Sequence, residues 1–216
     1  RTSLAKRISD EYSRSFTFAT KKQRGSTQIK SITSNNIESW NKSEKTSDII
    51  NIYLKKELKI GESIEIEINY QVKLPDSKFT GYGFDNSNYF LKNWLIVFSN
   101  ISESEWYSQS NLNLNDQSLK KSRYEMKVSF DKNYYLFSNL KINKTEVLND
   151  TKNVYLSGSD INDVKIDLLI DENYRNFQNI NNEIETDIFK ISSLKEAEKK
   201  ITRVNNFVKD YFNDNS

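Results

Sequence analysis

The sequence predicts a mainly β protein, an antiparallel β-sandwich of two packed, saddle-like sheets, with a short N-terminal helix and a C-terminal amphipathic helix. Three observations lead to this prediction. Apolar and polar residues alternate along residues 60–74, short apolar runs of strand length recur through the middle of the chain, and the apolar period changes to three and four only near the end. No helical pattern separates the strand candidates, which argues against an α/β fold.

A helix is the first element expected. Leu4, Ile8 and Tyr12 recur at near-helical spacing, and Thr2 or Ser3 can cap that helix. Strand candidates follow, each a short run rich in β-branched and aromatic residues. They occupy residues 28–34, 48–54, 63–74, 89–98, 122–130, 134–142, 153–157 and 164–170.

Residues 60–74 carry the clearest strand pattern. From Ile64 onward every second residue is apolar, and Ile60 lies on the same side of the pattern. This alternation predicts a half-buried strand with the apolar residues on its inner face: Ile60, Ile64, Ile66, Ile68, Tyr70, Val72 and Leu74. We expect residues 58–61 to form the turn before it. Pro75, Gly81 and Gly83 should then take the backbone out of the sheet, because proline cannot donate to a ladder and glycine tolerates positive φ.

The last segment predicts an amphipathic helix with Ser192 or Ser193 as its cap. Apolar residues recur there at spacings of three and four: Leu194, Ala197, Ile201, Val204, Val208 and Tyr211. Two interpretations remain open. The helix packs on its own domain, or it begins a second domain after the polar bridge 171–187. The second interpretation divides the chain into residues 1–187 and 188–216, and it predicts weak self-association through an unpartnered apolar face.

Composition excludes several functions. The chain contains no histidine and no cysteine, so it cannot form a His-x-x-x-His zinc pair, a cysteine cluster, a Ser-His-Asp triad or a Cys-His dyad. Its 32 basic and 30 acidic residues are interspersed, which argues against nucleic-acid binding, since phosphate contacts need clustered Lys and Arg. The sequence has no apolar run of about 18 residues, the length expected of a membrane span.

Residues 74–94, LPDSKFTGYGFDNSNYFLKNW, follow the long strand with a Leu-Pro, a Phe-Thr-Gly-Tyr-Gly turn and an aromatic run. This order resembles the N-terminal β-domain of the gluzincin zinc aminopeptidases, the family of aminopeptidase N and leukotriene hydrolase. Residues 2–25 are similar to the helix and loop after the first hairpin in bacterial, Bacteroidetes-type members. Later segments fit further strands of that domain, so the resemblance covers about three quarters of the chain: residues 106–116, 124–140 and 154–170.

The resemblance implies a function without catalysis. In that family two imidazoles, a carboxylate and a general-base glutamate act at a zinc ion in a separate helical domain, and none of these imidazoles exists in this chain. We therefore expect a non-catalytic N-terminal domain, with its first hairpin missing, that docks on the catalytic domain of the same parent chain. It would shape the cleft that peptides enter, and zinc would belong to the parent domain. The resemblance also suggests an exported, periplasmic or cell-envelope location.

One strand of the family's N-terminal domain reaches the substrate cleft, and residues 90–96 correspond to it by their place in the order. Lys92, Asn93 and Trp94 are therefore the candidate residues for the edge of that cleft. Residues 90–96 contain neither the Gln nor the Glu that the family usually places there, which is a departure from its pattern. The structural alternative makes Trp94 a core anchor and Lys92 a surface charge.

Two other groups of residues invite functional interpretations. Four aspartates suggest a calcium site: Asp160, Asp163, Asp167 and Asp171. They lack the spacing of an EF-hand loop, and strand alternation puts the last three on a solvated face. Six aromatic residues suggest a carbohydrate-binding surface, although packing within a tyrosine-rich sandwich also explains them: Tyr82, Phe84, Tyr89, Trp94, Trp106 and Tyr107. An independent β-sandwich that binds glycan or protein at the bacterial cell surface is accordingly the alternative function.

Overall fold

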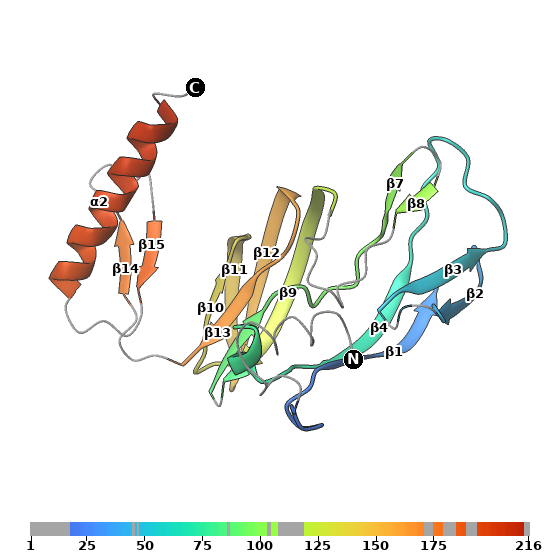
Figure 1. Cartoon of the computed structure of the whole chain (residues 1–216), viewed down its shortest axis with the longest axis horizontal. Helices are drawn as coiled ribbons and strands as arrows, with labels where there is room; N and C mark the ends of the chain where they lie inside the picture. Colours follow the sequence, from blue (N-terminus) through green and yellow to red (C-terminus); the bar gives the residue numbers. More distant parts are fainter. Residues whose placement is uncertain are drawn as a thin grey trace. The chain divides into compact units, whose positions relative to one another are not determined.

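The structure is a computed structural model, and it is mainly β, with antiparallel ladders and a C-terminal helix (Figure 1), as predicted. It describes residues 18–44, 46, 48–85, 87–102, 105–107, 119–170, 175–178, 185–188 and 194–213. The helix predicted from residue 2 lies outside these residues. Two compact units divide the chain: the first comprises Arg1–Lys132 and Leu136–Leu168, and the second comprises Asn133–Tyr135 and Leu169–Ser216.

A three-stranded antiparallel sheet forms one layer of the first unit. Its strands are β9 (Ser122–Asp131), β12 (Thr151–Ile161) and β11 (Lys141–Leu148), in the order β11-β12-β9. β12 is the central strand, and its Val154 lies directly opposite Val128 of β9. Since successive side chains alternate between faces, this register puts the apolar residues of both strands on one face and their polar residues on the other.

The second layer is a four-stranded sheet in the order β10-β13-β6-β5. Its strands are β10 (Tyr135–Ser138), β13 (Ile166–Leu169), β6 (Asn88–Leu91) and β5 (Gly83–Asp85). β13 runs antiparallel to β6, which in turn runs antiparallel to β5. The sequence prediction treats residues 134–142 as a single strand, but Asn139 and Leu140 interrupt the ladder, so the chain passes here from β10 in one sheet to β11 in the other.

The hydrophobic core of the first unit lies on the inner faces of these two layers. Val154 and Leu156 of β12 are each 2% exposed, and Ile166 of β13 is fully buried. Leu140 packs against β12 so closely that a Cβ added to Gly158 would lie 2.7 Å from its Cδ2 atom. The core comprises Leu136, Leu140, Val154, Leu156, Val164, Ile166 and Leu168.

Polar side chains join the connection between β10 and β11 to the connection between β12 and β13. The Asn139 side chain donates from Nδ2 to the Asp163 carbonyl at 2.8 Å and accepts at Oδ1 from the Lys165 amide at 2.9 Å. The Ser138 hydroxyl donates to the Lys165 carbonyl at 2.8 Å. These bonds satisfy backbone groups that no ladder reaches.

The long alternating segment forms β4 (Glu67–Lys73), paired antiparallel with β1 (Ser26–Thr33). The predicted alternation is confirmed, because the residues between the apolar ones are exposed while the apolar side chains themselves are half-buried. The half-buried residues are Ile64, Ile66, Ile68, Tyr70, Val72 and Leu74. The prediction for Ile60 is wrong, since its side chain is fully exposed. Ile60 lies in a turn closed by a 3.0 Å bond from the Glu62 amide to the Lys59 carbonyl, so the alternation does not extend that far.

The strand predicted at residues 89–98 is shorter in the structure, and a turn precedes its sheet partner β5. The strand predicted at residues 89–98 ends at Leu91, because Asn93 adopts a φ of 54° and takes the chain out of the ladder. A 3-10 turn, η2 (Ser77–Phe79), precedes β5, and Asp76 caps it by accepting from the Lys78 amide at 3.1 Å. Gly83 has a φ of 125°, and a Cβ there would collide with the Pro75 carbonyl, so only glycine fits.

Several short hairpins complete the strands. β2 (Ile37–Lys42) was not predicted, and it pairs with β3 (Ile50–Leu54). β7 (Asn100–Ser102) pairs with β8 (Glu105–Tyr107). The polar bridge predicted at residues 171–187 contains a third hairpin of the second unit, made by β14 (Arg175–Gln178) and β15 (Glu185–Ile188). β3 lies within the strand predicted at residues 48–54, whereas the other strands of these hairpins are too short or too polar for period-two alternation to be visible in a sequence.

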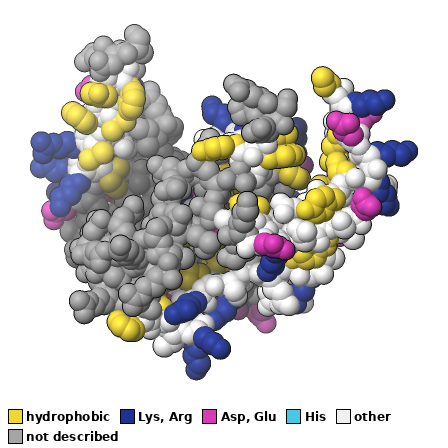
Figure 2. Space-filling view, turned by 45° about the vertical axis from the view of Figure 1, so that its right-hand side comes forward, with side chains coloured by type: hydrophobic (Ala, Val, Ile, Leu, Met, Phe, Trp, Pro, Cys, Tyr) yellow, Lys and Arg dark blue, Asp and Glu magenta, His cyan; other side chains and the backbone are white. Residues whose placement is uncertain are grey.

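The predicted C-terminal helix is confirmed as α2 (Leu194–Asn213). Its C-terminal half exposes much of its apolar surface, and hydrophobic side chains gather along one side of it with Lys and Arg beside them (Figure 2). We name the exposed set the apolar stripe of α2: Val204, Phe207, Val208, Tyr211 and Phe212. No helix within the described residues combines the length and apolar content needed to cross a membrane.

We predict that Leu156→Ala lowers the free energy of unfolding by about 2–5 kcal/mol, because the lost methyl groups leave a cavity in a packed core. Lys127→Ala, on the neighbouring strand and the opposite face, should change it by less than about 1 kcal/mol. Urea denaturation followed by circular dichroism measures both. Similar losses for the two variants would contradict the assignment of faces in this sheet.

Candidate functional site

The structure places the three candidate cleft residues just after β6. The Lys92 ammonium lies 3.3 Å from the Tyr82 hydroxyl, to which it donates, and 5.2 Å from the centre of the Tyr82 ring. Lys92 and Asn93 are exposed, whereas Trp94 is half-buried. The indole nitrogen of Trp94 is buried and has no hydrogen-bond partner among the described residues. None of the three residues lines either of the hollows described below.

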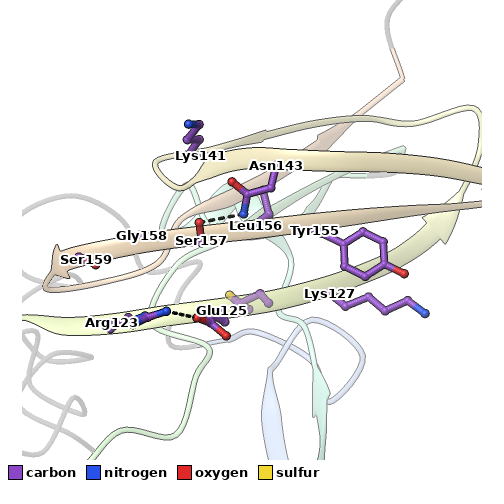
Figure 3. Close-up of a pocket in the computed structure, with 11 residues that line it drawn as sticks. Arg123, Glu125, Lys127, Lys141, Asn143, Tyr155, Leu156, Ser157, Gly158 and Ser159 are labelled. Carbon is purple, nitrogen blue, oxygen red and sulfur yellow. Dashed lines mark hydrogen bonds and ion pairs between the residues drawn. The ribbon is translucent and has the colours of Figure 1, made fainter.

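A shallow polar hollow of about 690 Å³ lies on the outer face of the β11-β12-β9 sheet (Figure 3). We call it the sheet-face hollow. All three strands contribute to it, and most of its side chains are polar or charged. Its lining comprises Arg123, Glu125, Met126, Lys127, Lys141, Asn143, Tyr155, Leu156, Ser157, Gly158 and Ser159.

Tyr155 stands in the middle of the sheet with a lysine on each side. The register places Lys127 of β9 and Lys144 of β11 directly opposite it. Each lysine Nζ lies 5.7 Å from the centre of the tyrosine ring, within the range of cation–π attraction. The two ammonium groups therefore share one aromatic ring, which fixes a positively charged row across the sheet.

Glu146 lies opposite Asn153, in the adjacent row, and its side chain reaches back to Lys144 and Tyr155. It accepts a hydrogen bond from the Tyr155 hydroxyl at 3.0 Å and forms an ion pair with Lys144 at 2.5 Å. The hydrogen bond from Lys144, followed by that from Tyr155, lowers the pKa of the Glu146 carboxyl below its ordinary value. The same contact with Glu146 raises the pKa of Lys144. Both groups are therefore held in their charged forms at neutral pH.

The next row along the strands contains Glu125, Ser157 and Lys141, again set opposite one another by the register. A bulge in β11 adds Asn143 to this row, and its amide donates to the Ser157 hydroxyl at 2.8 Å. Arg123, two residues before Glu125 on β9, forms an ion pair with it (Figure 3). Hydroxyl, amide and charged groups thus line the hollow side by side.

A second hollow of about 540 Å³ lies near Asn36, Leu58 and Glu65. Here the Asn36 side chain donates to the Lys56 carbonyl at 2.9 Å and accepts from the Lys56 amide at 3.0 Å. The Asn36 side chain thereby joins the segment before β2 to the segment after β3. We assign this polar group a structural role, because its hydrogen bonds are used within the chain.

The six aromatic residues that suggest a carbohydrate-binding surface belong to different parts of the fold. The Phe84 and Tyr89 rings pack with centroids 4.9 Å apart on β5 and β6, whereas the exposed Trp106 and Tyr107 lie on the β7–β8 hairpin of another sheet. Among the suggested calcium ligands, Asp167 forms an ion pair with Lys165 at 3.0 Å. Asp171 lies outside the described residues. No cluster of carboxylates suited to a metal ion occurs in the part of the chain that the structure describes.

Tyr155 and the lysines beside it were not predicted as site residues. Alternation along residues 122–130 puts Lys127 on a polar face, and that signal was available. Which residues of three strands stand side by side depends on the pairing register, and the bulge in β11 shifts that register at Asn143. The sheet-face hollow therefore becomes visible only in the folded chain.

Comparison with known proteins does not identify a family for this chain. No family model, curated protein or solved structure matches the chain. The resemblance to zinc aminopeptidases, the role of Lys92, Asn93 and Trp94, and the absence of cofactors from this chain stay predictions. The functional argument accordingly depends on the surfaces of the molecule itself.

We predict that Glu146 titrates below the ordinary glutamate range, and that Lys144→Gln moves its pKa upward. A lowered carboxyl pKa adds stability above its unfolded-state value, and this contribution disappears as the pH falls through the folded-state value. Carbon-detected NMR of the glutamate carboxyls measures the titration directly. Lys120→Gln, outside the hollow, is the control, and an unchanged Glu146 pKa in Lys144→Gln would contradict the ion pair.

Proposed function

We propose that this chain is a non-catalytic β-domain that works by docking on a neighbouring protein domain through the apolar stripe of α2. The exposure of that stripe is the observation that carries the proposal: its five side chains are between 42% and 68% exposed. Exposed apolar surface gathered on one element, with polar residues around it, is typical of an interaction site. Scattered single apolar residues on a surface would carry no such meaning.

The stripe has the shape that helix packing requires. Val204, Val208 and Tyr211 continue the spacing of three and four, so they follow one side of the helix. Phe207 stacks on Tyr211 with ring centroids 6.3 Å apart, and Phe212 meets Tyr211 edge-on at 5.5 Å. The aromatic rings form one continuous surface. Burying each large apolar side chain against a partner contributes roughly 1.5–3 kcal/mol before the cost of association.

Charged residues continue the same side of α2 toward its N-terminus. Lys200 forms an ion pair with Glu196 at 2.8 Å, one helical turn apart, and both side chains are largely exposed. Val204 follows Lys200 by four residues, so this pair lies one turn before the stripe on the same side of the helix. Such a pair adds little to stability, but it marks where the exposed apolar surface ends, so the surface available for docking lies in the C-terminal half of α2.

The resemblance to the zinc aminopeptidases supplies the partner for this docking. In our proposal the partner is a peptidase catalytic domain, which holds the zinc ion and the peptide substrate. This chain would narrow the cleft entrance, with Lys92, Asn93 and Trp94 at its edge. Lys92 is suited to that position because its charged end is exposed beside Tyr82. The lack of any histidine supports a role without hydrolysis by this family's mechanism.

A second candidate function is an independent β-sandwich binding module. The sheet-face hollow supports it, because a module of this kind needs a surface lined by polar groups on a rigid sheet. The two candidates use different surfaces, α2 in the first and the β11-β12-β9 sheet in the second. They can therefore be tested separately.

We predict that replacing Val204, Phe207 and Tyr211 together by serine leaves the thermal midpoint of the β-sheets within about 2 °C, because these side chains are exposed in the chain by itself. The same replacement should abolish self-association in sedimentation experiments and reduce the fluorescence of a hydrophobic dye. A matched variant replaces Lys195, Lys199 and Arg203 on the polar face by serine and should retain both signals. A large fall in the midpoint of the first variant would show that the stripe is buried by its own chain.

The peptidase partner has a separate test in the gene. A coding sequence that continues past residue 216 into a His-Glu-x-x-His motif would support a catalytic domain in the same chain. A continuation of several hundred codons without that motif would remove the peptidase from the proposal. Docking through α2 would then still depend only on the sedimentation and dye experiments.

A further inference from the structure

We infer that the sheet-face hollow binds an anionic polysaccharide, a chain of sugars that carry carboxylates. The hollow lies on the outer face of the β11-β12-β9 sheet and shares no residue with α2 or with residues 92–94. The inference therefore goes beyond docking and does not depend on it. Four features of the hollow support this ligand: its charge, its hydrogen-bonding groups, the pairing of its strands and its rigidity.

Charge around the hollow favours an anion. Two carboxylates already have partners, because Glu125 pairs with Arg123 and Glu146 pairs with Lys144. Lys127 and Lys141 also line the hollow, and neither forms an ion pair within the described residues. The local excess is thus two positive charges, in a chain whose overall net charge is only +2. An acidic ligand supplies the counter-charges that this face of the sheet lacks.

The positions of these two lysines favour a polymer. Lys127 is opposite Tyr155 and Lys141 is opposite Ser157, so the lysines lie on strands on either side of β12 and two residues apart along it. Strand spacing and rise place their Cα atoms roughly 12 Å apart. A ligand that pairs with both lysines in extended conformations carries at least two spaced carboxylates, as a chain of acidic sugars does.

The groups between the lysines favour sugar hydroxyls. Ser157 and Asn143 are joined by a 2.8 Å hydrogen bond, and Ser159 follows on the same strand. Hydroxyls both donate and accept, and an amide offers two donors and an acceptor, so this row can exchange hydrogen bonds with neighbouring hydroxyl groups. The Arg123–Glu125 pair adds further donors and acceptors at the rim, as Figure 3 shows.

Strand pairing argues against an extended acidic peptide as the ligand. A peptide that binds a sheet as an added strand uses the free backbone groups of an edge. β12 lies under the middle of the hollow, and its backbone is paired with β9 on one side and β11 on the other. The ladder hydrogen bonds of this backbone are already used, so side chains supply most of the free donors and acceptors, and side-chain contacts are sufficient for a saccharide.

The core beneath the hollow holds these groups in place. Val154 and Leu156 on the inner face of β12 are 2% exposed, and Tyr155 projects from the outer face between them. The tyrosine is itself fixed by Lys127, Lys144 and Glu146. The sheet and Tyr155 are thus already ordered before a ligand binds, so the ordering cost of binding falls mainly on the lysine side chains.

The test titrates the full chain with polygalacturonate by isothermal calorimetry at low salt. We expect binding that weakens with added salt, and a double variant Lys127→Gln with Lys141→Gln should weaken it by about tenfold or more, since two charge-assisted contacts are lost. Lys30→Gln with Lys120→Gln, two lysines outside the hollow, is the matched control and should bind as the original chain does. Circular dichroism checks that each variant is folded.

Two further ligands complete the experiment. Fully methyl-esterified polygalacturonate keeps the sugars but loses the charges, and we expect no binding. Poly-L-glutamate keeps the carboxylates but has a peptide backbone, and binding of equal affinity would overturn the choice of a saccharide. No binding of polygalacturonate, or equal binding by the hollow variant and the control variant, would overturn the site itself.

Discussion

The central position of β12 is the constraint on which the first unit depends. This strand is paired on both edges, its inner face carries the buried side chains of Val154 and Leu156, and its outer face carries Tyr155. A shift of its register by one residue would expose Val154 and Leu156 and bury the polar side chains between them, such as Asn153 and Ser157. The same pairing therefore fixes the hydrophobic core and assembles the charged rows of the sheet-face hollow.

The second unit follows a different physical rule. α2 is long enough to form backbone hydrogen bonds along 20 residues, but much of its apolar surface has no cover within the described chain. Helices gain most of their stability from packing an apolar face rather than from propensity. The two surfaces consequently suggest two kinds of interaction: an apolar one through α2 that gains from excluding water, and a polar one on the sheet that depends on charge and salt.

Local pattern alone predicted the fold class, the half-buried face from Ile64 to Leu74, and α2. These features repeat over many residues, so period and composition reveal them. Asn93 shows why boundaries were missed: one residue with positive φ ended a strand whose aromatic composition suggested a longer one. The site residues Lys92, Asn93 and Trp94 came from family resemblance and stay untested, while Lys127, Tyr155 and Lys144 meet only through long-range pairing that no local pattern encodes.

Native-state hydrogen exchange, followed by NMR, tests the central claim most directly. If β12 holds the core and α2 awaits a partner, the amides of Val154 and Leu156 should exchange only through global unfolding. The amides of α2 should exchange orders of magnitude faster, through local opening that leaves the sheets intact. Equal protection of α2 and β12, with the same denaturant dependence, would contradict the account, because it would mean that the helix is an integral part of one cooperative core.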